Sequence, residues 1–141
     1  MDILFHKEEY VPKRKKYTMN FKQTLAYMES IKNYGIVPGL STIKKLCERL
    51  GNPQDKLSFV HIAGTNGKGS VLAFLSSILK CAGYKVGSYH SPAVFYDCER
   101  FQINGRAISK KAFFECVEEV KNACDFMVEE GFAHPTTFEV E

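Results

Sequence analysis

Apolar residues recur at the spacing of one helix face in several stretches of the chain. The first stretch runs from Phe21 to Ile31 and closes at Gly35. The second runs from a Ser41 cap to a stop at Gly51-Asn52-Pro53. These two segments predict helices that pack against the rest of the domain.

A longer amphipathic helix is predicted after a Ser109 cap, and His134-Pro135 breaks it. Its apolar face comprises Phe113, Val117, Val120, Cys124 and Met127. Its opposite, polar face comprises Glu118, Lys121 and Asp125. Residues 136–141 predict the opening of another element.

The pattern changes in the middle of the chain. Residues 59–63 form a nearly continuous apolar run, which is typical of a strand buried on both faces of a parallel sheet. A glycine-rich stretch follows, then a predicted helix that Gly83 ends, and residues 84–89 predict a second strand. This βαβ crossover predicts an α/β fold, a P-loop-type three-layer domain with a mainly parallel sheet.

The remaining segments predict irregular structure and one hairpin. Residues 90–99 are polar and rich in turn formers, whereas Asn104-Gly105 supplies the positive φ angles of a type I′ hairpin turn. Residues 1–17 predict an N-terminal arm. Its basic run, Lys13 to Lys16, is interpreted as solvated, because no aromatic interleaving accompanies it.

Composition limits the classes of protein to which this chain can belong. The 141 residues are 45% hydrophobic and 25% charged, which fits an ordinary globular domain and excludes a disordered or membrane-spanning chain. A net charge of +3 is mild, so we expect neither nucleic acid nor membrane as a partner. The start of the chain lacks the apolar core of a secretory signal, and the five cysteines form no CxxC pair. We therefore expect a cytoplasmic protein with reduced thiols.

The glycine-rich stretch carries the candidate chemistry. Glycines let backbone N–H groups approach phosphate oxygens, and the following helix N-terminus adds free donors and partial positive charge. Lys68 would neutralise the β and γ phosphates, and the Ser70 hydroxyl would lie near magnesium. The strict GxxxxGK[ST] spacing is absent, because Gly69 separates these two residues. The alternative is a glycine-rich turn without a ligand.

Four motifs in this order resemble the Mur ligase superfamily, specifically its folylpolyglutamate synthase / dihydrofolate synthase branch. They are Gly51-Asn52-Pro53-Gln54, the loop Gly64-Thr65-Asn66-Gly67-Lys68-Gly69-Ser70, Tyr89-His90-Ser91-Pro92 with Glu99 to Gly105, and Thr137-Phe138-Glu139. The resemblance covers about residues 20 to 141. It implies a ligase that uses ATP and Mg²⁺ to join L-glutamate to a folate or to dihydropteroate through an acyl phosphate.

The resemblance also implies roles for individual residues. Nucleotide binding falls to Gly64, Thr65, Asn66, Gly67, Lys68, Gly69 and Ser70, with Lys68 also catalytic. The implied magnesium ligands are Ser70, Ser91 and Glu139, and the implied substrate contacts are Phe95 and Arg100.

Several of these residues could instead have a purely structural role. Ser91 before Pro92 suits a turn, and Glu139 suits the first turn of a helix, where a carboxylate stabilises the dipole. Phe95 could anchor its loop to the core, and Arg100 could form a local ion pair beside Glu99. His61, inside the predicted buried strand, is interpreted as a core histidine.

The family's later motifs and C-terminal domain do not occur in these residues. Residues 18–141 are therefore expected to be the N-terminal part of the ATP-binding domain of a larger, monomeric ligase, inactive alone and able to self-associate through an exposed strand edge. The alternatives are another P-loop NTPase or kinase, or a non-catalytic nucleotide-binding fragment.

Overall fold

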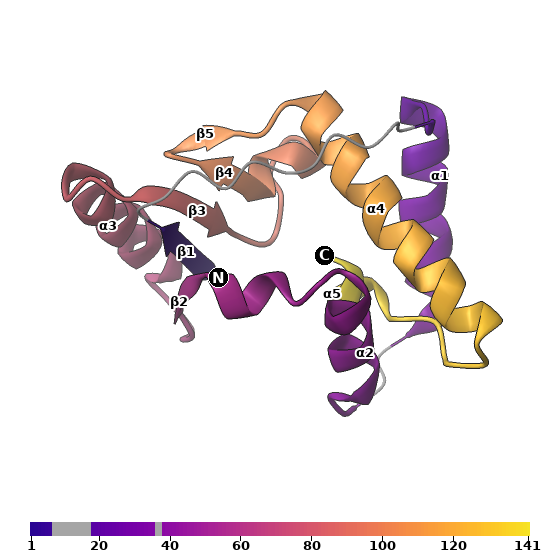
Figure 1. Cartoon of the computed structure of the whole chain (residues 1–141). Helices are drawn as coiled ribbons and strands as arrows, with labels where there is room; N and C mark the ends of the chain where they lie inside the picture. The colour runs from indigo at the N-terminus through magenta and orange to yellow at the C-terminus, as the bar shows by residue number, and fades with distance from the viewer. Residues whose placement is uncertain (7–17, 36–37) are drawn as a thin grey trace. The chain divides into compact units, whose positions relative to one another are not determined.

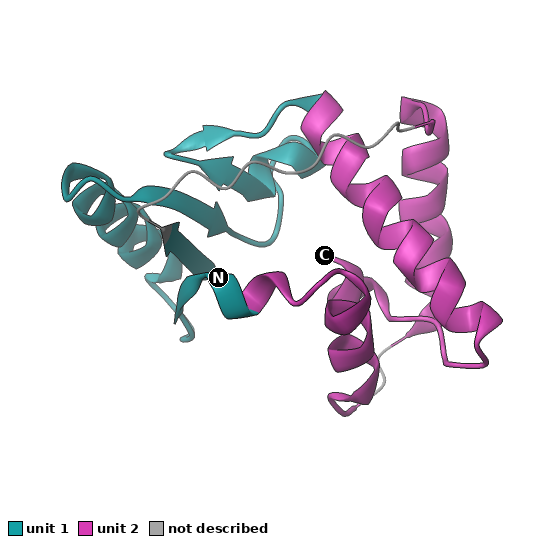
Figure 2. Ribbon diagram, in the orientation of Figure 1, with its two compact units in different colours: residues 1–14, 55–110 teal, residues 15–54, 111–141 magenta. Residues whose placement is uncertain are grey.

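The computed structural model describes residues 1–6, 18–35 and 38–141 (Figure 1). The chain divides into two compact units (Figure 2). The first combines residues 1–14 with 55–110, and the second combines residues 15–54 with 111–141. The basic run from Lys13 to Lys16 lies outside the described residues.

The first unit is a five-stranded sheet with one long helix. Its strands are β1 (Asp2–His6), β2 (Ser58–His61), β3 (Lys85–Tyr89), β4 (Phe101–Ile103) and β5 (Arg106–Ala107), in the order β2-β1-β3-β4-β5. Helix α3 (Lys68–Cys81) connects β2 to β3, and the short 3₁₀ helix η3 (Asp97–Arg100) precedes β4. The α/β expectation is confirmed.

The expectation of a mainly parallel sheet is wrong for the described residues, because every neighbouring pair of strands is antiparallel. The N-terminal strand β1 causes this difference. Residues 2–6 are a strand of the sheet, so the expectation of an N-terminal arm is wrong for them. It inserts between β2 and β3, pairing Ile3 with Val60 on one side and with Ser88 on the other. Strands β2 and β3 still run in the same direction, as the βαβ prediction requires, with one strand between them.

The position of β2 also differs from the prediction. It lies at the edge of the sheet and is largely exposed, so it is not the doubly buried strand that its apolar run suggested. The core of this unit lies between α3 and the sheet, where Ile3, Ile62, Leu72 and Val86 are buried together. An amphipathic helix whose apolar side covers a sheet gains stability from this burial.

The predicted hairpin is confirmed. Asn104 and Gly105 have φ angles of 51° and 77° and join β4 to β5. The Asn104 side chain also accepts a hydrogen bond from the Val86 N–H at 2.9 Å, which ties the turn to β3. The hairpin therefore extends the sheet beyond β3.

The second unit is helical. It contains α1 (Phe21–Ile31), the 3₁₀ helix η1 (Lys32–Tyr34), α2 (Ser41–Arg49), α4 (Lys110–Glu129) and α5 (Thr137–Val140), while the 3₁₀ helix η2 (Pro53–Lys56) spans the division between the units. Leu46, Ala123, Cys124 and Met127 form its buried core. The predicted apolar face of the long helix is confirmed.

Several helix ends differ slightly from the sequence prediction. Ser41 is the first helical residue of α2 and does not cap it, because the cap position falls on Leu40. Helix α4 ends at Glu129, before His134-Pro135, since Gly131 takes a left-handed φ of 84° that stops the helix.

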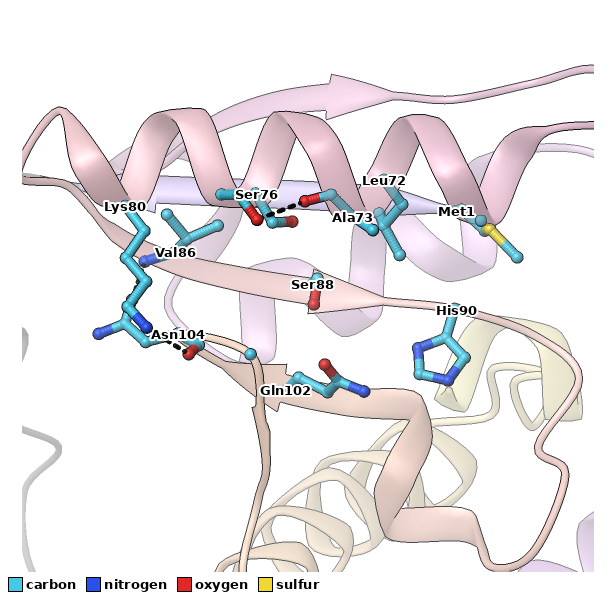
Figure 3. A pocket seen from close by; sticks show the side chains of 13 residues that line it. Met1, Leu72, Ala73, Ser76, Lys80, Val86, Ser88, His90, Gln102 and Asn104 are labelled. Atoms are coloured by element: carbon cyan, nitrogen blue, oxygen red, sulfur yellow. Dashed lines mark hydrogen bonds between the residues drawn. The ribbon is translucent and has the colours of Figure 1, made fainter.

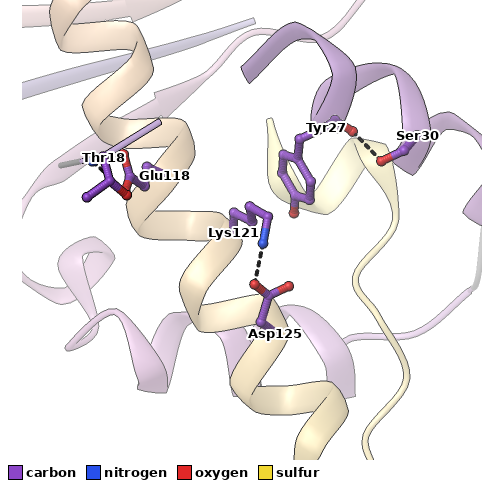
Figure 4. A network of polar contacts seen from close by, with 6 residues as sticks. All are labelled: Thr18, Tyr27, Ser30, Glu118, Lys121 and Asp125. Carbon is purple, nitrogen blue, oxygen red and sulfur yellow. Dashed lines mark hydrogen bonds and ion pairs between the residues drawn. The ribbon is translucent and has the colours of Figure 1, made fainter. Parts of the chain in front are cut away.

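One residue of the predicted polar face of α4 is buried. The Glu118 carboxylate, 6% exposed, accepts hydrogen bonds from the N–H groups of Thr18 and Met19 and from the Thr18 hydroxyl at 2.8 to 2.9 Å (Figure 4). Burial acts to raise the pKa of Glu118, but these donors and nearby Lys121 outweigh it and hold the pKa below its usual range. Glu118 therefore fastens the segment before α1 onto α4.

Candidate functional site

The loop of residues 64–70 connects the end of β2 to the start of α3. Gly67 occupies the cap position of α3 with a left-handed φ of 77°, and Gly64 has a φ of 145°. The first hydrogen bond within the helix runs from the Val71 N–H to the Gly67 carbonyl at 3.0 Å. The N–H groups before Val71 are therefore not part of the helical ladder, and no side chain caps them.

Lys68 lies over the loop. Its ammonium group donates to the Gly64 carbonyl at 2.5 Å and to the Thr65 carbonyl at 3.2 Å. The loop thus has a cation beside its free N–H groups, which is the combination that attracts a phosphate. A bound anion would offer the ammonium stronger, charged acceptors than these carbonyls.

The structure requires a glycine at one position of the loop but not at another. Gly67 needs its freedom because of its positive φ. Gly69 lies inside α3 without a positive φ, and a Cβ built on it would meet nothing within 4 Å. Packing within this unit therefore does not require a glycine at position 69.

The Ser-Pro loop after β3 belongs to the same unit. Arg100 donates from Nη2 to the Tyr89 hydroxyl at 2.5 Å and to the Ser91 hydroxyl at 3.3 Å. Its guanidinium also lies 5.3 Å from the centroid of the Tyr89 ring. Ser91 and Arg100, two of the predicted site residues, are thus brought together.

Phe95 does not anchor this loop to the core. Its side chain is 86% exposed, and its neighbours Val94 and Tyr96 are also exposed. The alternative reading of Phe95 is therefore wrong. The Glu99 carboxylate beside Arg100 accepts hydrogen bonds from the backbone N–H groups of Val94 and Phe95, the latter at 2.9 Å.

Glu139 lies in the second unit. Its Oε2 atom accepts hydrogen bonds from the Thr136 N–H at 2.9 Å and the Thr136 hydroxyl at 2.8 Å, and its own N–H donates back to that hydroxyl. This capping box begins α5, which agrees with the structural alternative for Glu139. The predicted metal role stays a prediction.

Two histidines lie in the same unit as the loop, His61 at the end of β2 and His90 directly after β3. His61 is exposed, and its Nδ1 lies 2.5 Å from Asp2 Oδ1, so the interpretation as a core histidine is wrong. The edge position of β2 explains this exposure. His90 donates its backbone N–H to the Arg100 carbonyl at 3.0 Å.

A cavity of about 380 Å³ lies between α3 and strands β3 and β4 (Figure 3). Small α3 residues, Ala73, Ser76 and Ser77, line one side, and Ser88 and Gln102 line the other. The sequence analysis missed it, although small residues at helical spacing on α3 are a signal for space beneath a helix. Gly69 is the member of the glycine-rich loop that reaches this cavity.

Neither a resident metal cluster nor a membrane-spanning helix occurs in the described ranges. Residues 1–6, 18–35 and 38–141 contain no group of three or more His, Cys, Asp or Glu side chains that could hold a metal ion. Within those ranges, every helix is too short or too polar to cross a membrane.

A strand, a glycine-rich loop with its lysine and an uncapped helix N-terminus form an α/β unit whose geometry suits phosphate binding. No family model matches the chain. The dihydrofolate synthase/folylpolyglutamate synthase of Bacillus subtilis is 40% identical over 107 residues, covering 76% of this chain and 25% of that protein.

Solved structures agree. The folylpolyglutamate synthase of Thermotoga maritima is 34% identical with a TM-score of 0.68, covering 83% of this chain and 28% of that one. The folylpolyglutamate synthetase of Lactobacillus casei is 29% identical with a TM-score of 0.72, covering 86% and 31%. The chain is a relative of the folylpolyglutamate and dihydrofolate synthases and spans about a quarter to a third of these proteins' length, which confirms the resemblance drawn from its motifs.

Proposed function

We propose that the loop of residues 64–70 binds the phosphates of ATP, as part of a ligase that joins L-glutamate to a folate or to dihydropteroate. The observation that carries this proposal is the Lys68 ammonium group, which lies on the loop carbonyls beside the uncapped start of α3. Solved relatives include one complex with AMPPCP, one with AMPPCP and folate, and one from E. coli with ADP, which supports nucleotide binding by proteins of this kind.

The proposed reaction has two steps. A carboxylate oxygen of the folate or pteroate attacks the γ-phosphorus of ATP, which gives an acyl phosphate and ADP. The glutamate amine then attacks the acyl carbon, and the amide bond forms as phosphate leaves and the amine loses a proton. Both steps gather negative oxygens, so Lys68 and the loop N–H groups would act by holding and neutralising the phosphates.

Hard oxygen ligands suit Mg²⁺, and the predicted set was Ser70, Ser91 and Glu139. The exposed Ser70 hydroxyl, in the first turn of α3, fits an ion that is also held by nucleotide oxygens. Ser91 accepts from Arg100, and Glu139 accepts from Thr136, so both have other partners in this structure. Bound with ATP, the ion would neutralise phosphate charge.

The setting of this site in the whole ligase is also a proposal. Residues 18–141 would form the N-terminal part of the ATP-binding domain, together with strand β1, which lies between the co-directional strands β2 and β3. Phe95 and Arg100 would contact the folate or pteroate. The complete enzyme would act as a cytoplasmic monomer.

The first test is a Lys68→Ala substitution in the 141-residue chain, measured by equilibrium binding of AMPPCP with Mg²⁺. Loss of a charged phosphate contact should weaken binding by about 10- to 100-fold. The ammonium group makes its hydrogen bonds to loop carbonyls at an exposed position, so the melting temperature should change little.

The matched control is Lys80→Ala. Lys80 lies near the other end of α3, and its ammonium contacts the Asn104 carbonyl at 3.4 Å. The control removes the same charge from the same helix and should leave AMPPCP affinity within about twofold. Equal affinity of the Lys68→Ala and unsubstituted chains would contradict the phosphate-binding proposal.

A further inference from the structure

The loop between β3 and η3 exposes three consecutive large apolar side chains. Val94, Phe95 and Tyr96 are 76%, 86% and 53% exposed. Burial in the core does not hold these side chains in place, so the conformation of the loop depends on hydrogen bonds to its backbone. The residues that make those bonds fix the backbone from which the aromatic rings project.

Glu99 makes the bonds at the far end of the loop. One carboxylate oxygen, Oε1, accepts from two consecutive backbone N–H groups, those of Val94 and Phe95. The Glu99 N–H donates in turn to the Tyr96 carbonyl at 3.1 Å. All three residues with exposed side chains are thus hydrogen-bonded to Glu99, two to its carboxylate and one to its N–H.

Two properties of these bonds make them strong for an exposed loop. The acceptor is charged, and consecutive N–H groups that point to one oxygen form an anion-binding nest. The pKa of the Glu99 carboxyl is held below its usual range, first by the Phe95 N–H and then by the Val94 N–H. The carboxylate is therefore ionised near neutral pH, the state in which it binds the loop.

The next residue, Arg100, holds the near end. Its side chain donates to the Tyr89 and Ser91 hydroxyls, and its carbonyl accepts from the His90 N–H. Glu99 and Arg100 together end η3 and lead into β4. Both ends of the Ser-Pro loop are thus attached to two adjacent residues immediately before strand β4.

We propose that Glu99 is a positioning residue, which fixes the loop of residues 91–96 so that Phe95 and Tyr96 present a preformed face to the planar ring system of the acceptor substrate. The inference rests on the proposed function, since that function supplies a folate or pteroate as acceptor. An ordered face binds more tightly than a mobile one, because less conformational entropy is lost on binding. The charge of Glu99 acts on the loop backbone, while the rings make the contact.

The first experiment measures amide hydrogen exchange in the 141-residue chain and three variants. Glu99→Ala removes both acceptors, Glu99→Gln keeps a neutral acceptor, and Asp97→Ala removes one carboxylate from the same short helix as a control. We expect exchange at the Val94 and Phe95 amides to accelerate by about tenfold or more in Glu99→Ala. Glu99→Gln should be intermediate, and Asp97→Ala should match the unsubstituted chain.

The second experiment measures folate binding by the same four proteins, by titration in the presence of AMPPCP and Mg²⁺. We expect folate affinity to fall by about tenfold in Glu99→Ala, less in Glu99→Gln, and by less than twofold in Asp97→Ala. Thermal unfolding of each variant shows whether the sheet is intact. A merely structural role for Glu99 would lower the melting temperature without this graded loss of affinity.

Several outcomes would overturn the positioning role. Unchanged exchange at residues 94 and 95 in Glu99→Ala would show that the carboxylate does not hold the loop. Faster exchange with unchanged folate affinity would show that order in the loop does not serve binding. If the unsubstituted chain binds AMPPCP but no folate, the positioning role fails while the nucleotide site stands; if it binds neither, both proposals fail.

Discussion

Lys68, Glu99 and Glu118 each bind backbone groups, and each does so with a different consequence. Lys68 lies on loop carbonyls that a phosphate can replace as its acceptors. Glu99 holds the N–H groups of an exposed loop. Glu118 is buried and holds the N–H groups of Thr18 and Met19. Burial decides the difference, because a charged group in the interior has no water to replace a lost partner.

At Glu118 this reasoning predicts a stability effect. Glu118→Gln should lower the free energy of unfolding at pH 7 by about 2 kcal/mol, because buried N–H donors lose a charged acceptor. The control is Glu115→Gln on the same helix, which removes only an exposed contact to Lys111 at 3.8 Å and should cost little. Urea unfolding measures both variants.

The same residue predicts a pH dependence. The folded pKa of Glu118 is lowered, so its contribution to stability is present above the unfolded pKa of about 4.3 and is lost as the pH falls through the folded value. The difference between the unsubstituted chain and Glu118→Gln should therefore be largest at neutral pH and shrink below about pH 4. A difference that stays constant down to pH 3 would contradict this account.

At the scale of elements, local signals were sufficient for most of the chain. Helical spacing located α1, α3 and α4, and Asn104-Gly105 located the hairpin, since each depends on residues that are neighbours in sequence. The Thr136 capping box began α5 where the sequence indicated a new element. These features follow from local propensity and capping.

Long-range pairing was not predictable in the same way. Ile3 pairs with Val60 and Ser88, which lie far along the chain, and nothing in residues 2–6 specifies those partners. The insertion of β1 made β2 an edge strand and exposed His61. The motif alone was sufficient to locate the candidate loop, whereas the backbone contacts of Glu99 and Glu118 could be identified only from the structure.

Substitutions of two loop glycines can distinguish an effect on stability from an effect on AMPPCP binding. Gly67→Ala should destabilise the chain by about 1 kcal/mol, because a Cβ disfavours the left-handed φ of 77° at this cap. Gly69→Ala has open space and no positive φ, so its stability should be unchanged or slightly raised. Its AMPPCP affinity should nevertheless fall, because the new methyl group stands beside the N–H groups proposed to bind phosphate.

Thermal unfolding and AMPPCP titration measure both glycine variants. If Gly69→Ala binds AMPPCP as tightly as the unsubstituted chain, position 69 lies outside the phosphate site, and the loop geometry would need another explanation. If Gly69→Ala is instead strongly destabilised, its glycine serves packing, which the open space around it argues against.

At the scale of the whole molecule, the chain pairs a sheet unit that holds the loop of residues 64–70 with a helical unit that holds Glu139. It spans 25% to 31% of the length of the three relatives named above. Nucleotide binding and turnover make different demands. The proposed phosphate contacts lie in the loop of residues 64–70, whereas amide formation also needs the glutamate placed against the acyl phosphate.

We therefore expect the purified 141-residue chain to bind AMPPCP and yet to form no glutamyl amide. The measurement supplies ATP, Mg²⁺, L-glutamate and either tetrahydrofolate or dihydropteroate, and follows ADP release together with amide product. Lys68→Ala serves as the blank, because it should bind nucleotide about 10- to 100-fold more weakly. ADP release above this blank without amide would mean that the chain activates the carboxylate or hydrolyses ATP unaided. Amide product above the blank would show that these residues already contain a complete ligase site.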